Sequence, residues 1–199
     1  MKFNSILIAF CLFQVLICST IGLNEKSLQD AAANTLRYVK AYHQESINLK
    51  NKDSLIDLKF NYPALTTNNV LFKIDEYGLL TVKYANIKAS ITGKYNYKYQ
   101  FWKSKVDFTA HLNNLNWEVT YLSSIKDLGN GKTEIHFKIN KESKINCNLM
   151  KLAAPKLKEN DKTIQEIKYK LKDIDLTPLK SELRKITQLI LDTLNSYLK

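Results

Sequence analysis

The longest pattern in the chain is an alternation of apolar and polar residues from Leu80 to Leu122. Leu80, Val82 and Tyr84 alternate with polar residues, which is the period of a β-strand with one buried face. At Ile87 the alternation changes phase, and a matching change follows Asn113-Asn114 in the second arm. The pattern predicts one very long β-hairpin, with its turn at residues 100–103.

Each change of phase predicts a β-bulge. A slip of one residue would turn every later side chain to the other face, so an extra residue is needed to keep one face buried. With the turn at residues 100–103, the two bulges fall nearly opposite each other and bend both strands at one place. Each arm would be roughly 60 Å long at about 3.3 Å per residue, so the hairpin needs a large element to pack against.

The C-terminal segment supplies that element. Thr177-Pro178 predicts the start of a helix, with Thr177 as N-cap and Pro178 at the first helical position. Leu183, Ile186 and Ile190 then recur at steps of three and four, as on one face of a helix. The helix would be roughly 30 Å long, and we expect the sheet to enclose it.

The remaining segments give one helix and several strands. A capping-box-like start predicts a helix over residues 27–44. Alternation predicts strands at 55–62, 70–77 and 167–171, and either one long strand or a broken one at 135–149. Together these elements predict an α+β fold. A long, highly twisted antiparallel sheet wraps around a long C-terminal amphipathic helix, with a short N-terminal helix.

The N-terminus predicts secretion. Residues 1–22 carry one lysine, an apolar run and small residues at Thr20 and Gly22, as in a cleaved signal peptide. We expect residues 23–199 to form one domain, with Cys147 as its only cysteine and as a buried free thiol. An intermolecular disulfide through Cys147 is the alternative.

Charge and motifs exclude several function classes. The formal charge is +11, but only Arg37 and Arg184 are arginines, and base-edge readers depend on bidentate arginine. We therefore expect no nucleic-acid partner. No HExxH, GxSxG, phosphate loop or Cys/His spacing occurs, and His111 and His136 fall on polar strand faces. We expect no enzyme, no metal and no cofactor.

The strand segments Ala85-Asn86-Ile87-Lys88 and Gly93-Lys94-Tyr95 resemble the strand signature of the bactericidal/permeability-increasing protein and lipopolysaccharide-binding protein family. The order of elements agrees over residues 27–199. This resemblance, to the tubular lipid-binding (TULIP) superfamily, implies a half-barrel that holds lipid between sheet and helix. A single half would be similar to the group 7 mite allergens. The usual strand-to-helix disulfide cannot form with one cysteine. An antimicrobial or innate-immunity role belongs to the same expectation.

The apolar stripes allow two interpretations. They fill a closed core, or they line a lipid groove whose facing layers do not meet. The resemblance favours a groove for ten residues: Ile87, Ile91, Phe108, Leu112, Ile135, Phe137, Leu183, Ile186, Ile190 and Leu194.

The hairpin tip interleaves lysines with aromatic residues. We expect contact with an anionic membrane or lipopolysaccharide through Lys94, Lys98, Phe101, Trp102, Lys103 and Lys105; the alternative is an ordinary solvated turn. In the family resembled, the matching stretch is basic and is assigned to endotoxin contact. The sequence thus predicts a secreted, monomeric lipid-binding protein. The alternative is a secreted binding or structural protein with a closed core and a basic surface for protein partners.

Overall fold

The computed structural model describes residues 24–41, 46–75, 79–99, 102–129, 132–158 and 161–197. The expected signal peptide, residues 1–22, and the turn residues Gln100 and Phe101 lie outside this range, as do the side chains of Lys98 and Trp102. Among the helices it describes, none is both long enough and apolar enough to cross a bilayer.

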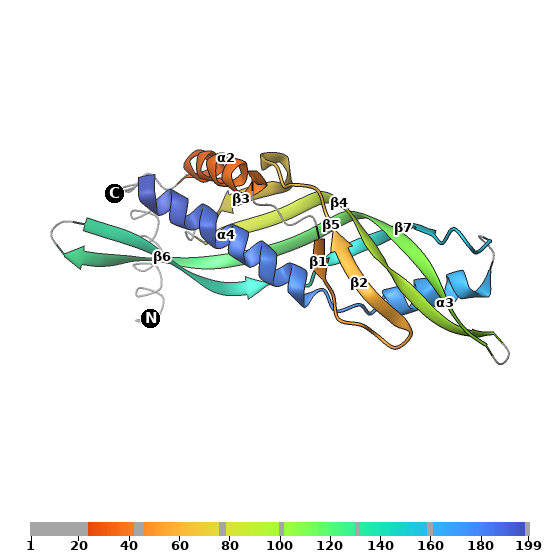
Figure 1. Ribbon diagram of the computed structural model, residues 1–199. Coiled ribbons are helices and arrows are strands. Elements are labelled where there is room, and N and C mark those ends of the chain that lie inside the picture. Colours follow the sequence, from red (N-terminus) through yellow and green to blue (C-terminus); the bar gives the residue numbers. More distant parts are fainter. Residues whose placement is uncertain are drawn as a thin grey trace.

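The chain forms one seven-stranded antiparallel sheet and three α-helices within the described residues. The elements are α2 (Glu25–Ala41), β1 (Ser46–Asn48), β2 (Leu55–Asn61), the 3-10 helix η1 (Thr67–Asn69), β3 (Val70–Ile74), β4 (Leu80–Tyr99), β5 (Trp102–Gly129), β6 (Lys132–Glu142), β7 (Asn146–Ala153), α3 (Lys162–Leu171) and α4 (Thr177–Tyr197). The strand order is β1-β2-β4-β5-β6, with β3 also paired to β4 and β7 to β5. The molecule is elongated: α4 lies along one half of the β4–β5 hairpin and α3 along the other (Figure 1). The predicted α+β architecture is confirmed, and the sheet is not closed into a barrel.

The two predicted bulges are present and lie opposite each other. The register shifts between Tyr84 and Ile87 on β4, and again where Ile87 and Ala89 face Leu115 and Leu112 on β5. Asn86 and Asn114 have φ of 58° and 50°, and asparagine tolerates this left-handed conformation better than most residues. Because each strand contributes one extra residue, the two shifts compensate and the hairpin stays in register to its tip.

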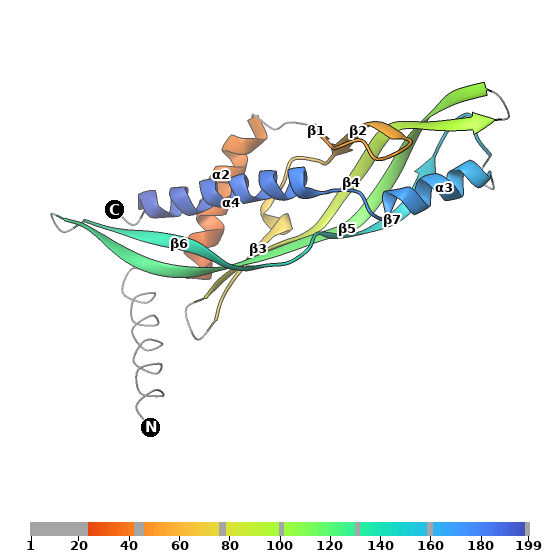
Figure 2. The same cartoon turned by 90° about the horizontal axis from the view of Figure 1, so that it is seen from below.

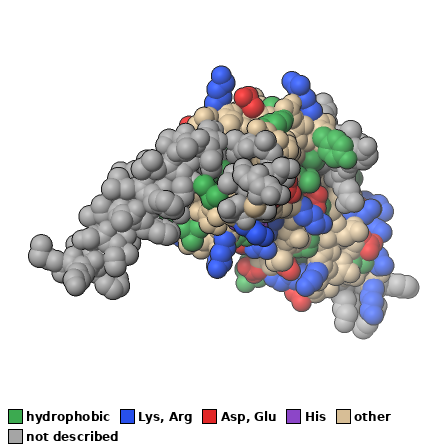
Figure 3. Space-filling model, turned by 90° about the vertical axis from the view of Figure 1, so that its left-hand side faces the viewer, with side chains coloured by type: hydrophobic (Ala, Val, Ile, Leu, Met, Phe, Trp, Pro, Cys, Tyr) green, Lys and Arg blue, Asp and Glu red, His purple; other side chains and the backbone are tan. Residues whose placement is uncertain are grey.

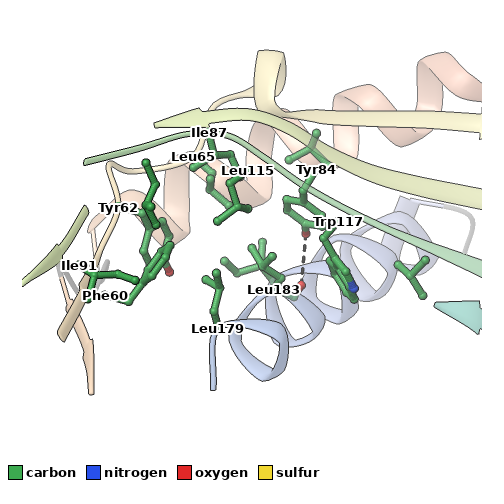
Figure 4. Packing of buried hydrophobic residues seen from close by; sticks show 14 of the residues in the cluster. Phe60, Tyr62, Leu65, Tyr84, Ile87, Ile91, Leu115, Trp117, Leu179 and Leu183 are labelled. Atoms are coloured by element: carbon green, nitrogen blue, oxygen red, sulfur yellow. Dashed lines mark hydrogen bonds between the residues drawn. The ribbon is translucent and has the colours of Figure 1, made fainter. Parts of the chain in front are cut away.

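The bulges keep one face of the hairpin buried under α4. Tyr84 and Trp117 pack with ring centroids 5.5 Å apart, and both are almost fully buried. The Tyr84 hydroxyl donates to the Leu183 carbonyl at 3.3 Å (Figure 4). It also lies 2.8 Å from the Thr187 hydroxyl, which donates to the same carbonyl at 2.9 Å. Burial raises the pKa of Tyr84 well above its usual value, so its hydroxyl stays protonated. This half of the molecule is a closed core.

Polar contacts fix α4 to its neighbours along its length. Arg184 donates two hydrogen bonds to the Glu142 carboxylate at 2.7 and 2.5 Å, and Lys180 pairs with the same carboxylate. Near the end of α4, Asn195 exchanges two hydrogen bonds with the backbone of Ile135, at 2.9 and 3.0 Å. Helix α2 crosses α4 steeply on its other side (Figure 2), where the hydroxyls of Thr35 and Thr193 lie 2.8 Å apart.

The strand predicted at residues 167–171 is wrong, because this segment is helix α3. Ile164, Ile167 and Leu171 recur at steps of three and four and face the sheet. The Asp161 carboxylate caps the helix by accepting from the Thr163 backbone N–H at 2.8 Å. The predicted cap of α4 also differs: Thr177 is already helical, and the Asp175 carboxylate accepts from its N–H at 2.9 Å.

Candidate functional site

Helix α3 lies against the tip half of the hairpin and is held along one side. Lys170 pairs with Asp53 at 3.3 Å, and Lys52 pairs with Asp173 at 3.6 Å just beyond the helix. The Tyr95 hydroxyl of β4 donates to the Glu166 carboxylate at 2.6 Å. Burial and the Glu166 carboxylate raise the pKa of Tyr95 to about 12, so Tyr95 remains a donor at neutral pH. The described part of α3 buries only Ile164 and Ile167 fully.

The other side of α3 faces a cavity of about 1370 Å³, called here the β7–α3 cavity. Its floor is the sheet, which contributes Ile91 from β4, Leu112 from β5, and Cys147 and Leu149 from β7, with Ile145 just before β7. Leu112 and Leu149 are cross-strand partners, so the apolar floor is continuous from β5 to β7.

The roof of the β7–α3 cavity is α3 and the segment that joins it to α4. Tyr169 and Leu171 come from α3, and Ile174 and Leu176 from the connecting segment. The β7–α3 cavity is therefore bounded by β7 on one side and by α3 and its connecting segment on the other. The volume of this cavity exceeds the roughly 300–1,000 Å³ of usual small-molecule pockets.

The charges that line the β7–α3 cavity are mainly positive. Four lysines and one carboxylate contribute to its walls. The carboxylate, Asp175, is engaged as the cap of α4, and Lys180 is engaged by Glu142. Lys144, Lys168 and Lys172 have no ion-pair partner among the described residues. The site therefore combines an apolar interior with uncommitted cations.

Cys147 is a free thiol, as predicted, but it is half-buried in the wall of the β7–α3 cavity and not in the core. Burial raises the pKa of its thiol, which favours the uncharged and less reactive form at neutral pH.

A second cavity of about 1410 Å³ lies on the far side of α3, next to the hairpin tip. Lys103 and Lys105 line this tip cavity and are exposed. Lys94 instead pairs with Asp57 at 2.9 Å, and this ion pair lowers the pKa of Asp57 and raises that of Lys94. Tyr95 and Tyr97 stack with centroids 6.5 Å apart. Lysines also occur elsewhere: at the opposite end of the molecule they are scattered among acidic and apolar side chains (Figure 3).

The structure divides the ten residues predicted for the groove. Ile91 and Leu112 line the β7–α3 cavity. The other eight belong to the packed core or its edge, and line neither cavity: Ile87, Phe108, Ile135, Phe137, Leu183, Ile186, Ile190 and Leu194.

Potential metal ligands form no cluster in the part of the chain that the structure describes. No three His, Cys, Asp or Glu side chains there lie close enough together to hold a metal ion. His111 and His136 are exposed, as their strand phase predicts, whereas His43 lies outside the described residues.

Sequence reasoning missed most of the cavity wall. Tyr169 and Leu171 were assigned to a strand, and Ile174 and Leu176 were not considered as a lining. The available signal was the capping residue Asp161 followed by apolar residues at helical spacing.

A scan of known protein-family models finds no match, and a search of curated protein sequences finds none either. Among solved structures, a crystal structure of lipopolysaccharide binding protein is similar over 87% of this chain and 38% of its own length, with 12% identity and a TM-score of 0.41. Takeout 1 of Epiphyas postvittana is similar over 89% of this chain and 91% of its own, with 12% identity and a TM-score of 0.40. The chain thus spans 38% of the length of lipopolysaccharide binding protein. Since both TM-scores are below 0.5, we base the functional proposal on the geometry of this chain.

Proposed function

We propose that this protein binds lipid, and that the β7–α3 cavity holds the apolar chain of an amphiphile. The observation that carries the proposal is a cavity of about 1370 Å³ with an apolar floor and uncommitted lysines in its wall. Burial of an acyl chain stabilises a complex by about 0.8 kcal/mol per CH₂ group. The lysines would favour a carboxylate or phosphate headgroup over a neutral one.

The same proposal includes a secreted, single-domain monomer without catalytic activity, cut after residue 22. A closed core under α4 supplies the stability, and the tip half of the hairpin supplies the binding site. Exposed Lys103 and Lys105 support the expected contact of the hairpin tip with anionic lipid or lipopolysaccharide. Lys94 contributes less to that contact if it keeps its pairing with Asp57.

Two variants on adjacent residues of β7 test the cavity. Leu149 lines the cavity, whereas its neighbour Met150 is 66% exposed and does not line it. We expect Leu149→Trp to fill part of the cavity and to weaken binding of a fluorescent long-chain fatty acid at least tenfold. Met150→Trp adds the same side chain outside the cavity and should bind the probe like the wild type.

Native mass spectrometry of the purified protein complements this titration, since a retained lipid appears as a defined mass increment. If the wild type neither retains a lipid nor binds the fatty acid, the lipid proposal fails and the alternative, a basic surface for protein partners, takes its place. If Leu149→Trp and Met150→Trp bind equally well, the lipid lies elsewhere.

A further inference from the structure

Helix α3 has three distinct faces, and one of them lines the β7–α3 cavity. Ile164 and Ile167 face the sheet, while Glu166 and Lys170 bond to Tyr95 and Asp53. Gln165, Lys168, Tyr169 and Lys172 follow at helical spacing and form the third face, which lines the β7–α3 cavity.

This third face carries an exposed aromatic side chain and lysines, which are not required to cover a cavity. Tyr169 is 70% exposed although it lines the cavity, and Leu149 across the opening is 37% exposed. Lys168 and Lys172 lie one turn apart, a slightly unfavourable spacing for like charges. Lys144 adds a third uncommitted cation from the opposite side of the opening. Together these residues form the mouth: Lys144, Leu149, Lys168, Tyr169 and Lys172.

We propose that the mouth docks on an anionic lipid bilayer, with its three lysines against headgroup phosphates and Tyr169 at headgroup level. Lysine clusters beside exposed aromatic and aliphatic side chains are the composition that anionic bilayers attract. The one carboxylate among the described lining residues, Asp175, lies 3.9 Å from the Lys50 ammonium, which offsets its negative charge. The inference rests on the proposed function, because docking by the mouth would let an acyl chain pass from the bilayer into the cavity without crossing water.

The test is co-sedimentation with vesicles of phosphatidylcholine and phosphatidylserine, compared with phosphatidylcholine alone. Each lysine near an anionic surface contributes about 1 kcal/mol, and about 1.4 kcal/mol is tenfold in affinity. Lys144/Lys168/Lys172→Gln should therefore weaken binding to the anionic vesicles roughly 100-fold.

A control variant separates docking from net charge. Lys83, Lys88 and Lys138 are exposed on the outer face of the sheet, and Lys83/Lys88/Lys138→Gln removes the same charge. We expect it to weaken binding only a few-fold, through the screened long-range field. Tyr169→Ala should weaken vesicle binding relative to the wild type, and this difference should remain when salt is added.

An uncharged fatty-alcohol probe distinguishes failure of this inference from failure of the proposed function. The mouth variant should still take up this probe, because its apolar lining is unchanged. If the mouth variant binds anionic vesicles as well as the wild type, or the outer-face control loses as much, docking by the mouth is refuted even if the cavity binds the probe. If Lys103/Lys105→Gln alone abolishes vesicle binding, the hairpin tip is the docking surface and the inference is again refuted. If the wild type takes up no probe, the lipid-binding function itself is refuted.

Discussion

Helix α4 offers a direct test of whether its apolar stripe is core. The side chains of Leu183 and Ile190 are completely buried, whereas that of Leu189 on the same helix is 44% exposed. Truncation of a fully buried Leu or Ile to Ala costs about 2–5 kcal/mol, because it removes transfer free energy and leaves a cavity. Leu189→Ala should change the unfolding free energy by less than about 0.5 kcal/mol, since leucine and alanine both favour helix.

The assay is equilibrium unfolding in urea, followed by circular dichroism. With a denaturant dependence of about 2 kcal/mol per molar, Leu183→Ala and Ile190→Ala should lower the midpoint by about 1–2.5 M. Leu189→Ala should lower it by less than about 0.25 M. Ile190→Val, at about 0.5–1.5 kcal/mol, gives a measurable value if the larger truncations do not fold. Losses below about 1 kcal/mol for both Leu183→Ala and Ile190→Ala would show that the stripe does not form the core.

Three further predictions concern single residues. Gly93→Ala should destabilise by about 1–3 kcal/mol, since its methyl would lie 2.7 Å from Leu58 Cδ2; an unchanged urea midpoint would contradict this contact. Arg184 and Lys180 hold the pKa of Glu142 below its usual value, so the added stability is complete at neutral pH and is lost as pH falls through that lowered pKa. Glu142→Gln should therefore be less stable than the wild type at neutral pH and should match it in acid; a pH-independent difference would exclude the ion pair. Cys147 should react slowly with maleimide and more slowly when an acyl ligand is bound, and non-reducing mass mapping should find a free thiol; rapid labelling unaffected by ligand would contradict its place in the cavity wall.

The bent hairpin could be predicted from sequence because the signal is local. A phase change at Ile87 and another after Asn114 each require one extra residue, and both bulges occur there. The stripe on α4 was equally clear, since an apolar face on a long helix must be covered.

The cavity could not be predicted in the same way. Ile167, Tyr169 and Leu171 satisfy a strand period as well as Ile164, Ile167 and Leu171 satisfy a helical one. Even with α3 assigned correctly, its placement involves partners far away in sequence, as in the ion pairs of Lys170 with Asp53 and of Asp173 with Lys52. Periodicity identifies buried residues such as Ile91 and Leu112, but does not tell whether the layer opposite touches them.

The opposed bulges at Asn86 and Asn114 have a consequence for how such a protein can change. They divide one continuous hairpin into a half that is covered by α4 and a half that is covered by α3. Because the register is restored beyond the bulges, the tip half can acquire substitutions without shifting a single pair beneath α4. If the β7–α3 cavity binds lipid as proposed, exposed residues of its lining can therefore change the ligand preference with little effect on thermodynamic stability. Substitutions at exposed lining residues such as Leu149 and Tyr169 should alter which amphiphile is bound while the urea midpoint stays nearly constant. A library of such variants measured for both properties should show no correlation between them.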